Sequence, residues 1–322
     1  MKILKFTGIF LLFLFLALTV FGLYLNRGLP YEIKPASFQC LDLKDGHFVP
    51  FDTLPENIYG IGLAYAGHIN ETASAFDPGV DPPVFKKAVN SKVGNGSKVK
   101  IPTHAELVNA VEQLESGIGE QINQVKNPLP SLLDYEVELG FVLLEDIAIK
   151  NLENEAYAPP IGFFIANDLS ARSLAVLGEG RPNRYEYWGV SKSFAGFTPI
   201  SEQVWIPNKF KANAIPCIML ETLVNNDIRQ QQMTSDLIYT PLQMLQAIHR
   251  KYPNTPLEKG DLVLTGTPGG VAMSAPRWLM RLADIIGMDR FEKLESVTEE
   301  DDLAKFLKAG DKVLTSGLRM KF

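Results

Sequence analysis

The sequence has few cysteines, no excess of positive charge, and no repeated or low-complexity segment. Its 322 residues include two cysteines, Cys40 and Cys217, in no motif typical of metal binding or redox chemistry. Two such cysteines can form one disulfide in an oxidising compartment, although we expect two buried free thiols. The 31 lysines and arginines are outnumbered by 37 acidic residues, and the net charge is -6. Nucleic-acid binders usually carry a basic stripe, so we expect no nucleic-acid partner.

The sequence also lacks the regular alternation of strand and helix that builds a doubly wound parallel sheet. Short apolar runs stand between Gly, Pro, Asn and Asp residues and predict strands at 141–144, 162–165 and 261–264. Helical spacing of apolar residues is found in only a few places: about 105–124, 242–249 and 276–286. We therefore expect an α+β fold dominated by a mixed or antiparallel sheet.

Charged residues are missing from the run Phe6–Leu25, which follows Lys5 and ends before Arg27. About 20 residues with a helical rise of 1.5 Å each span roughly 30 Å, the thickness of a bilayer core. We expect residues 1–27 to form a single-pass membrane anchor through residues 6–25. A cleaved signal peptide is the alternative, because basic residues precede the run and Gly22 offers a weak cleavage site. Positive charges flank both ends, so the side of the membrane stays open.

The segment 134–142, DYEVELGFV, predicts a strand with two glutamates on one face. Glu136 and Glu138 are two residues apart, and apolar side chains alternate with them. Neighbouring carboxylates in a buried strand repel each other and stay ionised when a cation lies between them. Oxygen ligands of this kind favour a hard ion, Mg²⁺ or Mn²⁺. A half-exposed strand whose outer face carries two solvated glutamates is the alternative.

A second apolar strand, at about 162–167, ends on Asp168. This aspartate could supply a third oxygen ligand beside Glu136 and Glu138. It could also cap the element that follows the strand. The spacing of the residues leaves both interpretations open.

Six segments together resemble the fumarylacetoacetate hydrolase family in their order and approximate spacing. They are IGLAYAGHINE, DYEVELGFV, GFFIANDLSAR, WGVSKSF, VNNDIRQQQMTSDLIY and GDLVLTGTPGGVA. The resemblance begins near Tyr59, so we divide the chain into the anchor (1–27), a linker and N-terminal extension (28–58), and a catalytic domain (59–322). It implies the strand-rich β-roll of the family's C-terminal domain, behind an N-terminal transmembrane helix.

The resemblance implies a metal site and a neighbouring lysine. Glu136, Glu138 and Asp168 match the three carboxylates with which the family binds Mg²⁺ or Mn²⁺. Lys192, in the segment SKSF, matches a lysine that lies beside metal and substrate.

The resemblance also implies four residues that handle substrate and water. Arg172 and Thr267 match residues of the substrate pocket, and His68 and Glu71 match a pair that activates water. A spacing of three residues puts His68 and Glu71 on one face of a helical turn. A carboxylate there fixes the tautomer of the imidazole and raises its basicity, as a general base requires.

The chain departs from the family at several places around these motifs. Ala64 stands where Asn is common, Gly67 where a polar residue is frequent, and Ser173 where an acid is frequent. These positions lie beside the implied site, so the substrate preference stays open.

Two stretches, about 103–130 and 273–304, are longer than in compact relatives. Residues 276–288 of the second are amphipathic and could lie on a membrane surface. We expect them instead to pack on the domain or on a dimer partner.

The implied activity is metal-dependent hydrolysis of a carbon–carbon bond in a 1,3-diketo acid, such as an acylpyruvate, through a metal-bound enolate. Oxo-acid decarboxylation and keto–enol isomerisation are alternatives, because all three reactions pass through the same enolate. The intact His68–Glu71 pair favours hydrolysis. A membrane-tethered binding protein without turnover is an alternative of another class, which the complete ligand set disfavours. Relatives are commonly homodimers, and we expect a homodimer.

Overall fold

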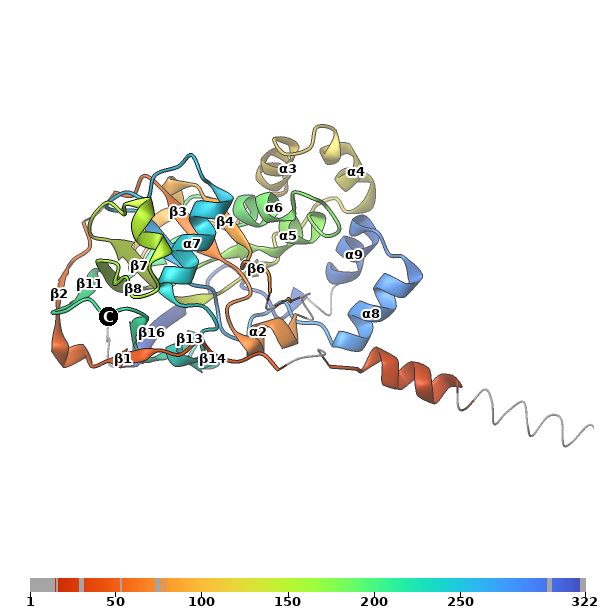
Figure 1. Ribbon diagram of the computed structural model, residues 1–322. Coiled ribbons are helices and arrows are strands. Elements are labelled where there is room, and N and C mark those ends of the chain that lie inside the picture. The colour runs from red at the N-terminus through yellow and green to blue at the C-terminus, as the bar shows by residue number, and fades with distance from the viewer. Residues whose placement is uncertain are drawn as a thin grey trace, which may run out of the picture.

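The computed structural model describes residues 15, 17–28, 32–52, 54–72, 76–77, 79–299 and 303–318. At the centre of this part of the chain lies a mixed sheet of nine strands (Figure 1). Seven of them follow one another in the order β2 (Gly46–Pro50), β11 (Gln203–Pro207), β8 (Ile161–Asn167), β7 (Val137–Leu143), β15 (Leu262–Leu264), β3 (Ile58–Ile61) and β4 (Val84–Lys87). The other two are β10 (Thr198–Ile200), which pairs with β8, and β5 (Lys92–Gly94), which pairs with β10. The expected mixed α+β fold is confirmed.

Strands β7 and β8 form the buried centre of the sheet. They pair antiparallel from Val137 opposite Asn167 to Leu143 opposite Ile161. Strand β15 pairs antiparallel with the other edge of β7 and parallel with β3, so the sheet is mixed. Every residue of β7 and β8 is buried, because apolar side chains cover both faces of the sheet.

One face of the sheet is covered by a helix and by a second sheet. Phe141 and Phe163 pack there in one cluster with Leu245 of α7 (Pro241–Lys251) and with Leu220. Leu220 belongs to a three-stranded sheet of β14 (Asp227–Met233), β13 (Met219–Val224) and β16 (Val313–Leu318). Full burial of a side chain of this size contributes about 1.5–3 kcal/mol, so β7 and β8 are firmly held.

A group of helices lies beyond the β4 end of the sheet (Figure 1). They are α3 (His104–Glu112), α4 (Ile118–Val125), α5 (Arg172–Leu177), α6 (Arg184–Ser191), α8 (Arg277–Ile286) and α9 (Arg290–Val297). The two long stretches noted in the sequence meet here, because the Arg290 guanidinium of α9 donates to both carboxylate oxygens of Glu115 (2.5 and 2.7 Å). The helix α9 therefore packs on the domain, whereas Trp278, Ile285 and Ile286 of α8 are exposed, so the packing expected for residues 276–288 stays a prediction.

The single helix expected over 105–124 was wrong, because the structure has two helices there, α3 and α4. Gly117 separates them with a φ of 83°, a left-handed conformation that interrupts a right-handed helix. The Glu112 carboxylate accepts a hydrogen bond from Gly119 N (2.8 Å) and another from Gly117 N, and so stabilises the start of α4. The helices expected at 242–249 and 276–286 are confirmed as α7 and α8.

Cys40 and Cys217 form a disulfide, so the expectation of two buried free thiols was wrong. The cause is a pairing that the sequence does not show. Strand β1 (Gln39–Leu41) runs parallel to β12 (Ala214–Pro216), which brings the two Cα atoms to 5.2 Å, within the usual range for a disulfide. With β1 and β2, residues 28–58 contribute strands to the folded domain.

The remaining short elements connect these parts. They are α2 (Ala66–Glu71), the paired strands β6 (Leu133–Asp134) and β9 (Ser170–Ala171), and 3-10 turns at Leu43–Asp45, Val89–Ser91, Ile149–Glu153 and Thr234–Asp236. The segment β6 and the loop before α8 flank the ends of β7 and β8, where the candidate site lies.

Residues 17–25 are helical and contact α8. Arg281 of α8 donates through Nη1 to the carbonyl oxygens of Tyr24 (2.7 Å) and Leu25 (3.2 Å), which ties this helix to the domain. No helix in the described ranges combines the length and the apolarity that a bilayer crossing needs. Residues 6–14 and 16, about half of the expected anchor, lie outside the described residues.

The disulfide predicts a loss of stability in a Cys217→Ser variant. The bond closes a loop between residues 177 apart, so its removal lowers the free energy of unfolding by about 3–5 kcal/mol. Urea unfolding of the full chain measures the change. As a control, dithiothreitol should destabilise the wild type and leave the variant unchanged. Two free thiols in the intact mass of the unreduced protein would contradict the assignment.

Candidate metal centre

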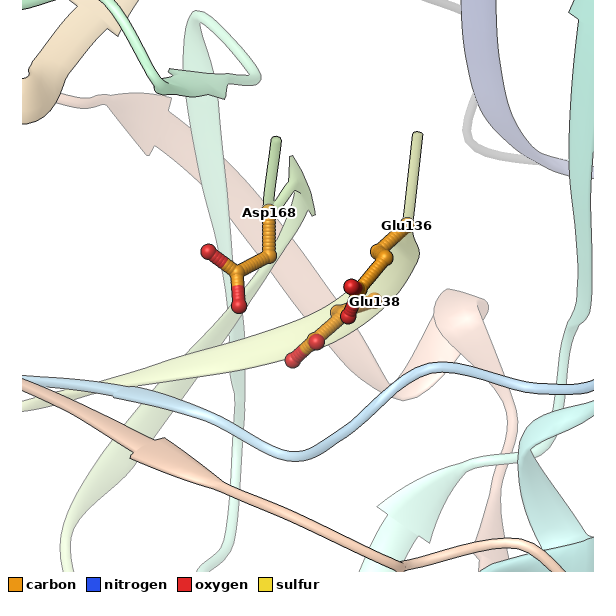
Figure 2. A group of neighbouring side chains, drawn as sticks. All are labelled: Glu136, Glu138 and Asp168. Atoms are coloured by element: carbon orange, nitrogen blue, oxygen red, sulfur yellow. The ribbon is translucent and has the colours of Figure 1, made fainter. Parts of the chain in front are cut away.

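Three carboxylates converge where β7 begins and β8 ends. Glu136 precedes β7, Glu138 lies within it, and Asp168 follows β8; the Asp168 amide donates to the Glu136 carbonyl (2.8 Å), which extends the strand pairing. One oxygen from each side chain lies within 4.8 Å of the others (Figure 2). The three residues are only 4%, 2% and 1% exposed. A half-exposed strand with two solvated glutamates is therefore excluded.

Asp168 faces lysines and does not cap a helix. The Lys192 ammonium lies 2.9 Å from Asp168 Oδ2 and 2.8 Å from Glu136 Oε2. Lys87, the last residue of β4, donates to Asp168 Oδ1. Residues 170 and 171 after Asp168 form the strand β9, and the cap of α5 is Ala171. Of the two interpretations of Asp168, the structure favours the ligand.

Lys87 is a part of this cluster that sequence reasoning missed. Its side chain is buried, and burial lowers the pKa of its ammonium while Asp168 opposes that change. The only signal in the sequence was a lysine at the end of the apolar run 82–85. Which carboxylate it would meet depends on the position of β4, which three strands separate from β8 in the sheet.

The charges around the cluster shift the pKa values of Glu138 and Glu136 in opposite directions. Burial, together with the charges of Asp168 and Glu136, raises the pKa of Glu138 well above its ordinary value. Burial alone would raise the pKa of Glu136 as well, but Arg172 and Lys192 lower it to about 2. A divalent cation beside Glu138 would compensate the repulsion that raises its pKa.

The oxygen atoms at the centre fit such a cation. Glu136 Oε1 lies 2.8 Å from Arg172 Nη2, and Asp168 Oδ2 lies close to Lys192, yet neither oxygen accepts a well-directed hydrogen bond. Buried carboxylate oxygens normally have such partners, so their lone pairs are available. An all-oxygen set of three carboxylates is the chemistry that Mg²⁺ and Mn²⁺ prefer. Glu136, Glu138 and Asp168 thus form a possible divalent-metal site.

Gly266 positions the Glu138 carboxylate. Gly266 N donates to Glu138 Oε2 (2.7 Å) from a backbone with a φ of 93°. A Cβ atom at this position would lie 2.7 Å from the side chain of Ala64 and 2.8 Å from the Ile61 carbonyl. Only glycine lets the loop after β15 approach this closely.

His68 and Glu71 form a pair in α2. The His68 Nδ1 lies 3.0 Å from Glu71 Oε1, and Glu71 Oε2 accepts a hydrogen bond from Gly270 N (2.7 Å). The carboxylate is thus fixed from both sides, and it selects the imidazole tautomer with the proton on Nδ1. Nε2 is then the ring nitrogen that can exchange a proton with the cavity.

Thr267 is held by a glutamine that sequence reasoning missed. Gln230 of β14 donates through Nε2 to Thr267 Oγ1 (2.8 Å), and its Oε1 accepts from Val137 N (3.0 Å). Thr267 in turn donates to the Val137 carbonyl (3.2 Å). Gln230 therefore joins the loop after β15 to the start of β7, next to the carboxylates.

Asp134 is a second missed residue, and it fixes Arg172. Its carboxylate is fully buried and accepts hydrogen bonds from Arg172 Nε (2.8 Å), Ala272 N (2.8 Å) and Met273 N (3.1 Å). The partly buried Arg172 guanidinium thus lies between Asp134 and Glu136. Because Asp134 also binds the loop that leads into α8, one side chain joins the carboxylates to the second long stretch.

The side chains open on one cavity of about 390 Å³. Seven of the eight expected site residues line it: His68, Glu136, Glu138, Asp168, Arg172, Lys192 and Thr267. Glu71 lies behind His68 and contacts it. The cavity extends from the carboxylates to α5, α8 and α9.

Comparisons with known proteins bear on this arrangement. Residues 57–317 match the family model for the fumarylacetoacetate (FAA) hydrolase C-terminal domain. The oxaloacetate tautomerase YisK of Bacillus subtilis is 27% identical over 232 residues, covering 71% of this chain and 65% of that protein. A 4-hydroxyphenylacetate degradation bifunctional isomerase/decarboxylase of Escherichia coli is 29% identical over 232 residues, covering 70% of this chain and 44% of that protein. The matches thus span only part of the length of these two relatives.

A solved structure supports the fold. A fumarylacetoacetate hydrolase family protein from Yersinia pestis CO92 has a TM-score of 0.50 with this chain, at 22% identity. The alignment covers 83% of this chain and 91% of the other. It shows a shared fold over most of both proteins.

The carboxylate cluster predicts that Glu138→Gln weakens Mn²⁺ binding. Changes to groups that only support metal ligands typically lower affinity 10–100-fold, so loss of a ligand should lower it at least about tenfold. Isothermal titration calorimetry of the metal-stripped full chain measures this. Glu179→Gln is the matched control, because Glu179 lines the same cavity outside the cluster. Equal affinities in both variants, or no binding by the wild type, would count against the site.

The buried pair of Asp134 and Arg172 predicts a large effect of Asp134→Asn on stability. The change removes one of the two carboxylates that face the Arg172 guanidinium and puts an amide NH₂ where a carboxylate oxygen accepted backbone hydrogen bonds. It should lower the free energy of unfolding by about 3–5 kcal/mol, the usual cost of breaking a buried ion pair. Asp81→Asn is the control, because Asp81 pairs with Arg250 on the surface, where a loss below about 1 kcal/mol is expected. Urea unfolding compares the two, and similar losses would show that Asp134 holds no more than a surface pair does.

Proposed function

This chain belongs to the fumarylacetoacetate hydrolase family, and we propose that within it the protein hydrolyses a carbon–carbon bond of an acylpyruvate-like 1,3-diketo acid. One observation carries the proposal. The hydrogen-bonded pair of His68 and Glu71 opens on the same cavity as the three buried carboxylates. A general base and a possible metal site thus face one small-molecule space.

The carboxylates would hold the cation, and the remaining residues would handle charge and protons. A divalent cation bound by Glu136, Glu138 and Asp168 supplies Lewis acidity for adjacent oxygens of an oxo acid. Lys192 lies beside two of these carboxylates and offers an ammonium for negative charge that develops on the substrate. Its charge persists, because Asp168 and Glu136 raise its pKa although burial alone would lower it.

His68 would transfer the proton that hydrolysis requires. Its Nε2 takes a proton from water, and the hydroxide oxygen bonds to the carbonyl carbon farther from the carboxylate. The bond between that carbon and the neighbouring CH₂ carbon then breaks, and its electron pair stays on the CH₂ carbon. Protonation of this carbon by His68 gives pyruvate, and the acyl group leaves as a carboxylic acid. Glu71 stabilises the imidazolium between these steps.

Arg172 is a candidate for binding the substrate carboxylate. Asp134 fixes its Nε, and its Nη2 lies 2.8 Å from Glu136 Oε1 without a well-directed hydrogen bond. A guanidinium held in one orientation recognises a carboxylate with little loss of side-chain entropy.

Tautomerisation or decarboxylation of an oxo acid is the second candidate. The named relatives favour it, because one is an oxaloacetate tautomerase and the other an isomerase/decarboxylase. These reactions use the same carboxylates and do not need a water nucleophile. The dependence on His68 therefore distinguishes them from hydrolysis.

We also propose a location for the domain. Disulfides persist in oxidising compartments, so the Cys40–Cys217 bond favours a domain outside the reducing cytosol, tethered through residues 6–25. Free thiols in protein taken from its native membrane would contradict this placement. The homodimer remains an expectation from the resemblance to the family.

Hydrolysis predicts that His68→Ala lowers kcat for acetylpyruvate cleavage about 10²–10⁴-fold, the usual contribution of a general base. The assay follows pyruvate release by the full chain with Mg²⁺ or Mn²⁺, and EDTA should abolish it. His47→Ala is the control, because His47 is exposed on β2. If the wild type acts only on the keto–enol equilibrium or the decarboxylation of oxaloacetate, and His68→Ala keeps that activity, the second candidate is correct.

A further inference from the structure

The cavity has an apolar part that the proposed chemistry does not use. The charged centre needs room only for the oxo-acid group of a substrate. Beyond it, the wall is formed by side chains of α5, α8, α9 and their loops: Ala175, Val176, Met273, Pro276, Leu279, Met280, Ala283, Met288, Val297 and Phe306. We call this wall the apolar arm.

The apolar arm begins directly at the charged centre. Met273 N binds Asp134, which holds Arg172, and Ala275 N donates to the carbonyl of Glu71 (3.3 Å). The chain then enters α8, whose Ala283 is 9% exposed and faces the cavity. A molecule held at the carboxylates can therefore extend along this loop without leaving the cavity.

The polar residues of this region are either paired with each other or exposed to solvent. Lys293 bonds to Asp284, and Arg184 lies 3.8 Å from Glu179. Ser296 and Lys305 are exposed. Val176, Ala283 and Phe306 form the buried part of the apolar arm, and Leu279 continues it to the surface, where it is 44% exposed. A mostly apolar wall with a few polar groups is typical of sites for largely apolar ligands.

We propose that the substrate carries an extended apolar acyl chain, which lies in the apolar arm while its oxo-acid end lies at the carboxylates. The proposal rests on the proposed function and narrows it to acylpyruvates with long alkyl groups. Their hydrolysis consumes one water and gives pyruvate and a medium- or long-chain carboxylic acid, with no further reactant. The helices α8 and α9 of the second long stretch contribute residues to the apolar arm. Glu115 of the first long stretch holds α9 in place through its contact with Arg290.

A series of substrates tests the proposal. We would reconstitute the full chain in lipid nanodiscs and measure kcat/KM for acetyl-, butanoyl-, hexanoyl- and octanoylpyruvate. Each substrate is kept below the concentration at which it aggregates. Each methylene that leaves water for an apolar wall should raise kcat/KM about threefold. We expect octanoylpyruvate to exceed acetylpyruvate at least about a hundredfold, because six methylenes are added and some stay partly hydrated.

A pair of variants on α8 locates the effect. Ala283→Trp fills the arm and should reduce the octanoyl-to-acetyl ratio of kcat/KM to below about tenfold. Ile285→Trp is the matched control, because Ile285 is 51% exposed on the same helix and does not line the cavity. Its ratio should equal that of the wild type. The ratio does not depend on how much of each variant is folded.

A binding measurement separates this proposal from the proposed function. Calorimetry with Mn²⁺ and 2-oxo acids, from pyruvate to 2-oxodecanoate, reports affinity without turnover. Rising affinity with chain length but no cleavage of any acylpyruvate would refute the hydrolase and support the apolar arm. Cleavage with a flat dependence on chain length, or an Ala283→Trp ratio equal to that of the wild type, would overturn the apolar arm and leave the hydrolase standing.

Discussion

The antiparallel pairing of β7 with β8 is the constraint on which the site depends. It holds Glu136, Glu138 and Asp168 together at the end of two buried strands, where water cannot screen their mutual repulsion. The fold compensates this repulsion with Lys87, Lys192 and Arg172, which come from three other elements. Packing around β7 and β8 therefore keeps the site folded and also holds the three carboxylates in the arrangement that could bind a cation.

Residue spacing by itself placed correctly only residues that lie near each other in the sequence, whereas the resemblance to the family brought Asp168, Lys192 and Thr267 to the same cavity. The two-residue alternation of a strand places Glu136 and Glu138 on one face, and one helical turn brings His68 to Glu71. The contact of Asp168 with Glu136 depends on strand register, which spacing left open and the structure supplies. The pairing of Cys40 with Cys217 depends on β1 and β12, which are too short to be recognised in the sequence.

The residues that were missed act over longer distances. Asp134, Gln230 and Lys87 are buried polar side chains, and each satisfies groups from elements remote in sequence. The sequence does not show what such a side chain contacts. Gly117 was missed for a different reason, because apolar periodicity continues across it while its backbone turns left-handed. Local patterns thus indicated two of the candidate ligands and the family resemblance the third, while tertiary packing determined the groups that position them.

The contact between Arg281 and the carbonyl groups of Tyr24 and Leu25 has a mechanical consequence. These carbonyls are among the last of the N-terminal helix, where no further turn of helix satisfies them, so a guanidinium is a favourable partner. Two residues further along α8, Ala283 lines the cavity. A displacement of the N-terminal helix along its axis would therefore move α8 and, with it, the wall of the cavity.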